Sequence, residues 1–216
     1  MKIIAVLFIL GSSLGFAQES ETQNAAPESD MHKGFYLSIS GGLAFGAITL
    51  NATNTSFSKL EASGTGFQYD FKIGAVVSED ENLVLSLDAI RRIISGPTWS
   101  LDGSDVYSTT TVSASDAMYG IGITKYFMPS NMFISGTFGL GTFQIDYANS
   151  KVTSQAGFAF QLKGGEEWWV SDDWGLGVAV GLAHTAANDK ADPSNPSYSG
   201  KLSTTKFFGT LSATFN

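Results

Sequence analysis

The sequence predicts an all-β protein, an eight-stranded antiparallel up-and-down transmembrane β-barrel. Three observations carry this prediction. Strand-like alternation recurs eight times, the segments between these strands alternate between short and long, and three of the four tryptophans gather beside one short turn. Beyond the N-terminal segment, no apolar stretch reaches the ~20 residues that a transmembrane helix needs. A chain of this composition is therefore expected to cross a membrane with strands, closed into a barrel.

The N-terminal segment MKIIAVLFILGSSLGFAQ has the order of a secretory signal peptide. A lysine precedes an apolar run, and small residues follow that run up to Ala17. We expect residues 1–17 to be removed on export. Residues 18–33 are polar and acidic without periodicity, which is typical of a flexible leader. The barrel is then expected over residues 34–216.

Composition excludes several classes of protein. The chain has no cysteine, so it has neither a disulfide framework nor the cysteine of a lipid anchor. The net charge of −8 argues against a nucleic-acid partner. The chain has only two histidines and no nucleotide-binding loop, so we expect no metal and no cofactor.

Each expected strand has bulky apolar residues on one face and small or polar residues on the other. In the first of them, Phe35 and Leu37 share one face, while Ser38 and Ser40 share the other. The same alternation predicts strands over residues 34–47, 66–78, 83–94, 116–128, 132–146, 156–170, 174–187 and 204–216.

The connections between these strands are sorted by length. Tight turns are expected at residues 78–82, 128–131 and 170–174. Mostly longer loops, rich in serine, threonine, asparagine, aspartate and glycine, are expected at residues 48–65, 95–115, 147–155 and 188–203. Outer-membrane barrels have short periplasmic turns and longer external loops, whereas a soluble sandwich has no reason to sort its loops by end.

Charged residues interrupt the small and polar face of the strands. They are Asp70, Lys72, Asp88, Arg92, Lys163 and Glu167. In the apolar cavity of a soluble barrel, each of these charges would cost several kcal/mol of desolvation. We therefore expect them to form a charge network in a narrow lumen, with the bulky apolar face toward lipid. Such a network either stiffens the barrel with salt bridges or forms a narrow path for ions.

Aromatic residues gather near the short turns. This set is Tyr126, Phe127, Trp168, Trp169, Trp174 and Phe215. Because amphipathic rings prefer the headgroup level, we expect them to form a periplasmic aromatic girdle. A second girdle toward the loops is expected from Phe67, Tyr69, Phe143 and Tyr147.

With these features, the sequence resembles the small eight-stranded outer-membrane barrels, such as the outer membrane protein X family and the transmembrane domain of outer membrane protein A. The phrases GFYLSISGGLAFG, YGIGITKYFMPSN and GGEEWWVSDDWGLGVAVG carry the likeness, which is one of pattern and covers about residues 34–216. The resemblance implies a closed barrel in outer-membrane lipid, inserted by the barrel assembly machinery, which reads the last strand. Here that strand departs from the usual aromatic ending, because Asn216 follows Phe215. We expect a monomer.

The expected function is structural, or one of surface interaction through the external loops. Trp99 and Tyr107 are the candidates for contact with an external partner, whose identity the sequence leaves open. The alternatives are a narrow ion or solute channel, a lipid-modifying enzyme and a soluble lipocalin-like binder. The barrels that deacylate lipid A use a histidine and a serine. His184 matches the histidine, but Ala186 stands where that serine would be, so we expect no catalysis.

Overall fold

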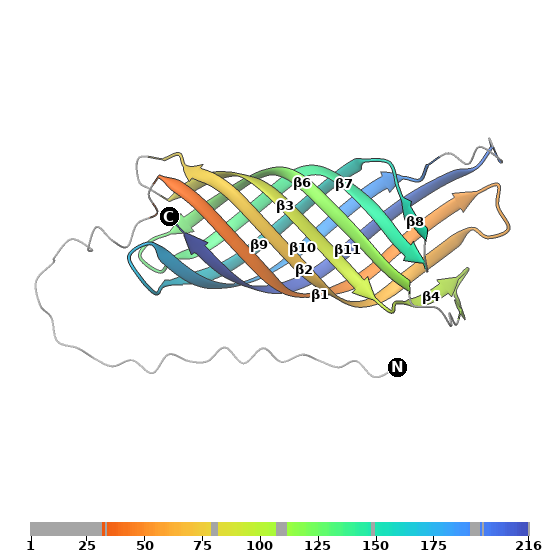
Figure 1. The fold of residues 1–216 in the computed structure, drawn as a ribbon, viewed down its shortest axis with the longest axis horizontal. Helices are drawn as coiled ribbons and strands as arrows, with labels where there is room; N and C mark the ends of the chain where they lie inside the picture. The colour runs from red at the N-terminus through yellow and green to blue at the C-terminus, as the bar shows by residue number, and fades with distance from the viewer. Residues whose placement is uncertain are drawn as a thin grey trace, which may run out of the picture.

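Side chains that alternate along each segment give long β-strands, and these strands wrap into a closed barrel (Figure 1). The computed structural model describes residues 32, 34–78, 82–106, 112–147, 150–190, 195 and 197–215. The expected signal peptide and, apart from His32, the expected leader lie outside these residues. Among them, no helix is long and apolar enough to cross a bilayer.

Eight long strands form the barrel wall within the described residues. They are β1 (Phe35–Thr53), β2 (Lys59–Val76), β3 (Leu83–Ser95), β6 (Val112–Phe127), β7 (Met132–Tyr147), β9 (Gly157–Trp169), β10 (Trp174–Asn188) and β11 (Ser199–Phe215). The shorter strands are β4 (Thr98–Leu101), β5 (Ser104–Val106) and β8 (Ser150–Thr153). The eight-stranded antiparallel architecture is therefore confirmed.

The wall is an antiparallel ring in chain order, and its seam joins the first strand to the last. β1 pairs with β2 on one side and with β11 on the other. The seam runs from the pair Leu37 and Phe215 to the pair Thr53 and Ser199. Closure of this kind leaves none of the long strands with an unpaired edge.

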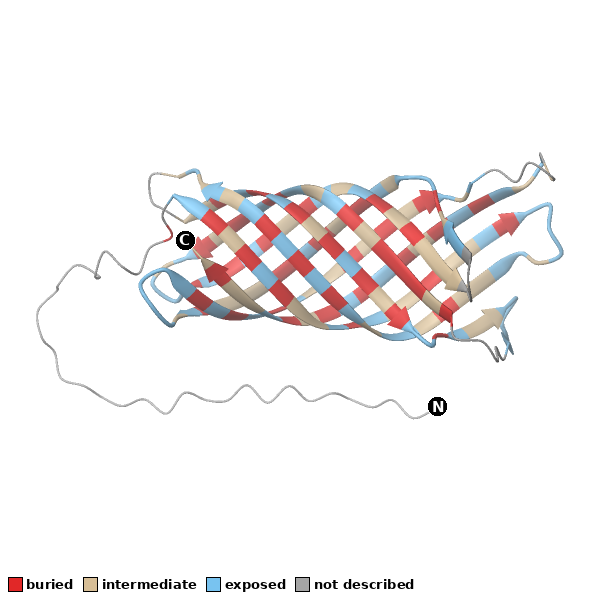
Figure 2. Cartoon of the chain, in the orientation of Figure 1, coloured by how far each residue is buried: buried red, intermediate tan, exposed pale blue. Residues whose placement is uncertain are grey.

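Buried and exposed residues alternate along every long strand, as the chequered colouring in Figure 2 shows. The large apolar side chains point outward: Leu87 is 64% exposed and Leu211 is 68% exposed. Eight charged side chains of the long strands are buried inside the barrel, and among them Lys72 is 1% exposed. This is the reverse of a soluble barrel and matches a wall that meets lipid.

The strands extend further at the loop end of the barrel than the sequence predicts. β1 continues to Thr53 instead of ending at residue 47, and β2 begins at Lys59 instead of residue 66. The prediction of a loop over residues 48–65 is therefore wrong for most of its length, because these residues form a strand hairpin that projects from the barrel (Figure 1). Outward residues such as Thr49 and Asn51 are polar, so the apolar alternation stops although the hydrogen-bonded ladder continues.

Glycines let neighbouring strands approach closely at the seam and between β6 and β7. A Cβ atom added to Gly42, on the inward face of β1, would lie 1.9 Å from the backbone oxygen of Gly209 in β11. Gly120 and Gly139, directly opposite each other on β6 and β7, are equally crowded by backbone. Only residues without a side chain fit at these approaches.

Hydrogen bonds link three loops into one loop rim, formed by Asn54, Ser58, Asp102, Asn195 and Ser197. Asp102 Oδ1 accepts hydrogen bonds from Ser58 N at 3.0 Å and Ser58 Oγ at 2.6 Å. Asn54 Nδ2 donates to Ser197 O at 2.6 Å, and Asn195 Nδ2 donates to Asn54 O at 2.9 Å. The hairpin between β1 and β2 is thereby tied to the β4–β5 turn and to the loop before β11.

The rim gives a testable titration. Hydrogen bonds from the Ser58 hydroxyl and from the backbone N–H groups of Lys59 and Ser58 hold the pKa of Asp102 below its usual range. Because the pKa is lowered, the hydrogen bonds to the ionised Asp102 carboxylate stabilise the rim fully at any pH above the ordinary aspartate pKa. This stabilisation is lost as the pH falls through the lower, folded value. A carbon-13 carboxyl titration should show the lowered pKa, and Ser58→Ala should raise it. An unchanged titration in Ser58→Ala would contradict this assignment.

Candidate functional site in the barrel lumen

The structure places all six charged residues singled out from the sequence inside the barrel. Each of Asp70, Lys72, Asp88, Arg92, Lys163 and Glu167 is buried. Two further buried charges, Asp116 and Lys206, belong with them and were missed. Their strand phase is the signal that identifies them, because Asp116 lies an even number of residues from the inward Thr124, and Lys206 from Thr210. The eight charges comprise four cations and four carboxylates, so the set is neutral.

The first cluster is centred on Asp116. Its Oδ2 accepts hydrogen bonds from Arg92 Nε at 2.8 Å and Thr185 Oγ1 at 3.3 Å, and Arg92 Nη2 lies 2.7 Å from the same oxygen. Its Oδ1 lies 2.5 Å from Lys206 Nζ. One carboxylate is therefore the shared counter-charge of Arg92 and Lys206. Removing it would leave both cations buried without that counter-charge.

The second cluster is centred on Asp70 and is joined to the first by a glutamine. Lys163 Nζ lies 3.2 Å from Asp70 Oδ2, which also accepts from Gln161 Nε2 at 3.0 Å. Gln68 Nε2 donates to Asp70 Oδ1 at 2.8 Å. Gln161 Oε1 in turn accepts from Arg92 Nη1 at 3.1 Å. The two clusters therefore form one continuous polar network across the lumen.

The third cluster pairs Lys72 with Asp88. Lys72 Nζ lies 2.8 Å from Asp88 Oδ2 and donates to Ser135 Oγ at 2.9 Å. Ser86 Oγ donates to Asp88 Oδ1 at 2.6 Å, and Thr137 Oγ1 donates to Asp88 Oδ2. Both charges are thus paired and hydrogen-bonded, which buried ions require.

Glu167 differs from the other carboxylates because no cation of the described residues forms an ion pair with it. Its Oε2 accepts from Thr214 Oγ1 at 2.9 Å and from the Tyr126 hydroxyl at 3.5 Å. The Tyr126 hydroxyl also lies 3.4 Å from that of Tyr36. Hydroxyl groups thus surround this carboxylate at the turn end of the lumen.

Apolar clusters fill the lumen at both ends of the charge network. The turn-end plug is formed by Tyr36, Val84, Tyr126, Phe133 and Ala179. The loop-end plug is formed by Ile48, Ala62, Ala114, Phe143, Ala187 and Leu202. Below the turn-end plug, the ring of His32 lies 3.6 Å from that of Tyr126, and its Nε2 lies 3.0 Å from Asn131 Oδ1. The structure therefore gives a filled interior, as expected for eight strands.

Two members of the expected periplasmic girdle are placed differently. Phe127, Trp168 and Trp174 point outward at the turn end, and the ring of Trp174 lies 5.4 Å from that of Phe215. Tyr126 is only 1% exposed and belongs to the turn-end plug, so its assignment to the girdle is wrong.

Trp169 is half-buried, and its ring lies 5.0 Å from that of His32 at the mouth of the barrel. Both misplaced residues follow the phase of inward neighbours, since Tyr126 is two residues after Thr124 and Trp169 is two after Glu167. Phe143, expected in the second girdle, is buried in the loop-end plug for the same reason. Tyr147 ends β7, and its side chain is not among those that the structure describes.

The candidate contact residues of the loops are not equally available. Trp99 lies in β4, half-buried against the loop-end plug, so it is not a free loop side chain. Tyr107 lies outside the described residues. On the outer face of β10, His184 Nδ1 lies 3.0 Å from Thr205 Oγ1. No group of three or more histidine, aspartate and glutamate side chains in the described part of the chain is placed to hold a metal ion.

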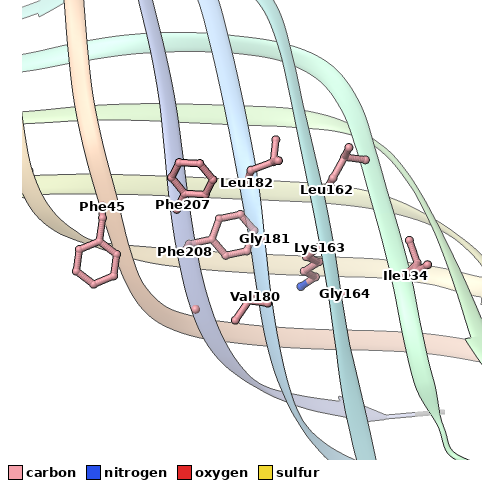
Figure 3. Close-up of a pocket in the computed structure, with 11 residues that line it drawn as sticks. Phe45, Ile134, Leu162, Lys163, Gly164, Val180, Gly181, Leu182, Phe207 and Phe208 are labelled. Carbon is pink, nitrogen blue, oxygen red and sulfur yellow. The ribbon is translucent and has the colours of Figure 1, made fainter. Parts of the chain in front are cut away.

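A hollow also opens on the outer face of the wall. Gly164 and Gly209 leave a recess of about 630 Å³, whose lining includes Phe45, Leu162 and Phe207 (Figure 3). Its lining is mostly apolar and lies among the exposed side chains of β9, β10 and β11. In a bilayer, lipid chains would fill it, and its lining also includes Lys163 and Phe208, whose side chains are buried inside the barrel.

Comparison with solved structures identifies the fold. Neisserial surface protein A is 13% identical, with a TM-score of 0.53 over 85% of this chain and 97% of that one. Outer membrane protein AlkL is 14% identical, with a TM-score of 0.50 over 93% of this chain and 96% of that one. The chain has the fold of the small eight-stranded outer-membrane barrels.

The other comparisons add nothing to this assignment of the fold. The outer membrane protease OmpT of Escherichia coli is 11% identical, with a TM-score of 0.46 over 90% of this chain and 99% of that one. No protein-family model and no curated protein matches the sequence. In outer-membrane barrels the short turns face the periplasm, and in this chain the short turns lie at the end of the barrel opposite the loop rim.

Proposed function

We propose that the protein is a closed, non-conducting outer-membrane barrel that acts at the cell surface through its loop rim and is not an enzyme. The observation that carries this proposal is the filled lumen, in which a neutral charge network lies between two apolar plugs. Export by residues 1–17 and insertion through β11 by the barrel assembly machinery belong to the same proposal.

The lumen supports a structural role for the charges. Asp70, Asp88 and Asp116 each bind a cation within 3.2 Å and also accept hydrogen bonds from neutral side chains. A permeating ion would have to displace these contacts and then cross an apolar plug. Paired and hydrogen-bonded charges of this kind stiffen a narrow barrel.

The loop rim supports the surface role. Loops that carry binding residues work best on a rigid scaffold, and here the strands themselves continue beyond the apolar band. Hydrogen bonds from Asn54 and to Asp102 then hold the hairpin tips together. The rim is thus an ordered polar surface at the end of the barrel that faces outward.

The lipid-modifying alternative has less support. His184 lies beside the Thr205 hydroxyl on the outer face, but no carboxylate of the described residues is hydrogen-bonded to this histidine. A hydroxyl nucleophile needs a base that a third group orients. The pair fits an interfacial hydrogen bond.

Two measurements test the proposal. In planar lipid bilayers, the refolded protein should give no stepwise conductance, because both ends of the lumen are plugged. Steps that change when Lys163 is replaced would show a channel instead.

Cells expressing the protein should adhere to a panel of immobilised extracellular matrix proteins. The double variant Asn54→Ala, Asp102→Ala removes the rim contacts made by these two side chains, and it should then adhere less at equal surface amounts. Equal adhesion, or none by the unaltered protein, would contradict a surface role for the rim.

A further inference from the structure

The two arginines of the chain are neighbours on β3 and point to opposite sides of the wall. Arg92 is buried and bound to Asp116. Arg91 is exposed on the outer face, and the structure gives it no ion pair or hydrogen bond with any residue that it describes. A cation on a lipid-facing wall is costly unless an anion meets it or water reaches it.

Two tyrosines flank Arg91 on the outer face. Tyr69 on β2 is directly opposite Arg91, and Tyr119 on β6 is opposite Ala89, one outward step away from Arg91. These tyrosines are 54% and 68% exposed. The small side chains of Ala89 and Ala117 leave a hollow of about 220 Å³ between them, and Arg91 and both tyrosines line it.

The depth of this hollow in the membrane follows from strand geometry. At ~3.3 Å per residue and a tilt of ~40°, the segment from Leu83 to Arg91 rises about 20 Å from the turn end of the barrel. The apolar band of such barrels is about 25 Å tall, which brings Arg91 near its outer boundary. Tyrosines prefer this level, and a long arginine side chain reaches from it toward the headgroups.

We propose that Arg91, Tyr69 and Tyr119 bind the phosphate group of a lipid headgroup in the outer leaflet. A guanidinium group pairs with phosphate oxygens through two parallel hydrogen bonds, and the phenol hydroxyls supply further donors. Exposed Ile39 and Phe71 border the same hollow and would contact the acyl chains of that lipid. With a net charge of −8, the chain as a whole does not attract anions, so the recognition is local to Arg91.

Arginine side-chain NMR tests this site with an internal reference. Only Arg91 and Arg92 give Nε–Hε signals, and Arg92 is enclosed in the lumen. The full chain is refolded in a maltoside detergent, which carries no phosphate, and is titrated with bisphosphorylated lipid A. The Arg91 signal should shift and saturate, while the Arg92 signal should stay in place. Arg91→Gln should weaken lipid binding, measured by native mass spectrometry, by about tenfold or more. Tyr69→Phe should weaken it less.

The comparison titrations separate the possible sources of phosphate. Dephosphorylated lipid A should leave the Arg91 signal unmoved, and so should inorganic phosphate at the same concentration. An equal shift with inorganic phosphate would show a site for free anions and overturn the lipid assignment. No shift with bisphosphorylated lipid A, or equal binding by Arg91→Gln, would overturn the proposal. Heat-modifiable migration on gels checks that each variant is folded.

Discussion

Replacing Asp116 by asparagine is expected to lower the free energy of unfolding by about 3–5 kcal/mol, the range for breaking one side of a buried ion pair. Asp116 is the shared counter-charge of Arg92 and Lys206, which lie 2.7 Å and 2.5 Å from its oxygens. Asparagine keeps the shape but removes the charge, so two cations remain buried in the lumen. The effect should exceed that of any single surface charge, because exposed pairs contribute ~0–1 kcal/mol.

The measurement is urea unfolding of the refolded barrel in lipid vesicles. Asp105→Asn, the same substitution at an exposed position of β5, is the matched control and should leave stability nearly unchanged. Adding Lys206→Met to Asp116→Asn removes one of the two stranded cations and should restore part of the loss. A loss below ~1 kcal/mol for Asp116→Asn alone would mean that water reaches Arg92 and Lys206 and screens them.

Gly42→Ala is expected to cost about 3 kcal/mol or more, at the upper end of the range for overpacking. Its new methyl group would lie 1.9 Å from the backbone oxygen of Gly209 and 2.7 Å from the Cα atom of Thr210. Backbone atoms in a paired strand cannot rotate away as a side chain can. The seam between β1 and β11 would have to separate locally.

Gly209→Ala is the control for this prediction. The two glycines lie at the same seam, but a Cβ atom on Gly209 has no neighbour closer than 3.9 Å. Refolding yield, read from heat-modifiable migration, and urea unfolding should both fall for Gly42→Ala and stay near the original for Gly209→Ala. Equal behaviour of the two variants would show that the seam is wider than the structure has it.

Strand phase explains which parts of the lumen the sequence could predict. The period of two places Lys72 and Glu167 on the inward face without any knowledge of their partners. The same count assigns Asp116 to the lumen, but Asp116 is the first residue of the expected strand 116–128 and was not included among the inward charges. Tyr126 was assigned by its closeness to a turn, and its phase with Thr124 is the stronger signal. Counting residues from a known inward neighbour therefore predicts orientation better than the type of residue does.

The loop rim could not be predicted in this way. Beyond the apolar band, both faces of the strands meet water, so neither alternation nor hydrophobicity marks where they end. The contacts of Asp102 with Ser58, and of Asn54 with Ser197, join residues from loops that are far apart in the chain. The pairing of β4 with β2 brings Asp102 to Ser58, and closure of the barrel between β1 and β11 brings Asn54 to Ser197. No local sequence pattern records either pairing.

The seam also sets the order of events when the protein is made. The residues that pair with the second side of β1 are those of β11, near the far end of the chain. Until Ser199–Phe215 has been synthesised and exported, β1 has an unpaired edge that another chain can bind. Contacts so distant in sequence also form slowly. We therefore expect the exported chain to need a holding chaperone, and the pairing of its last strand with its first to be the step that commits it to the membrane.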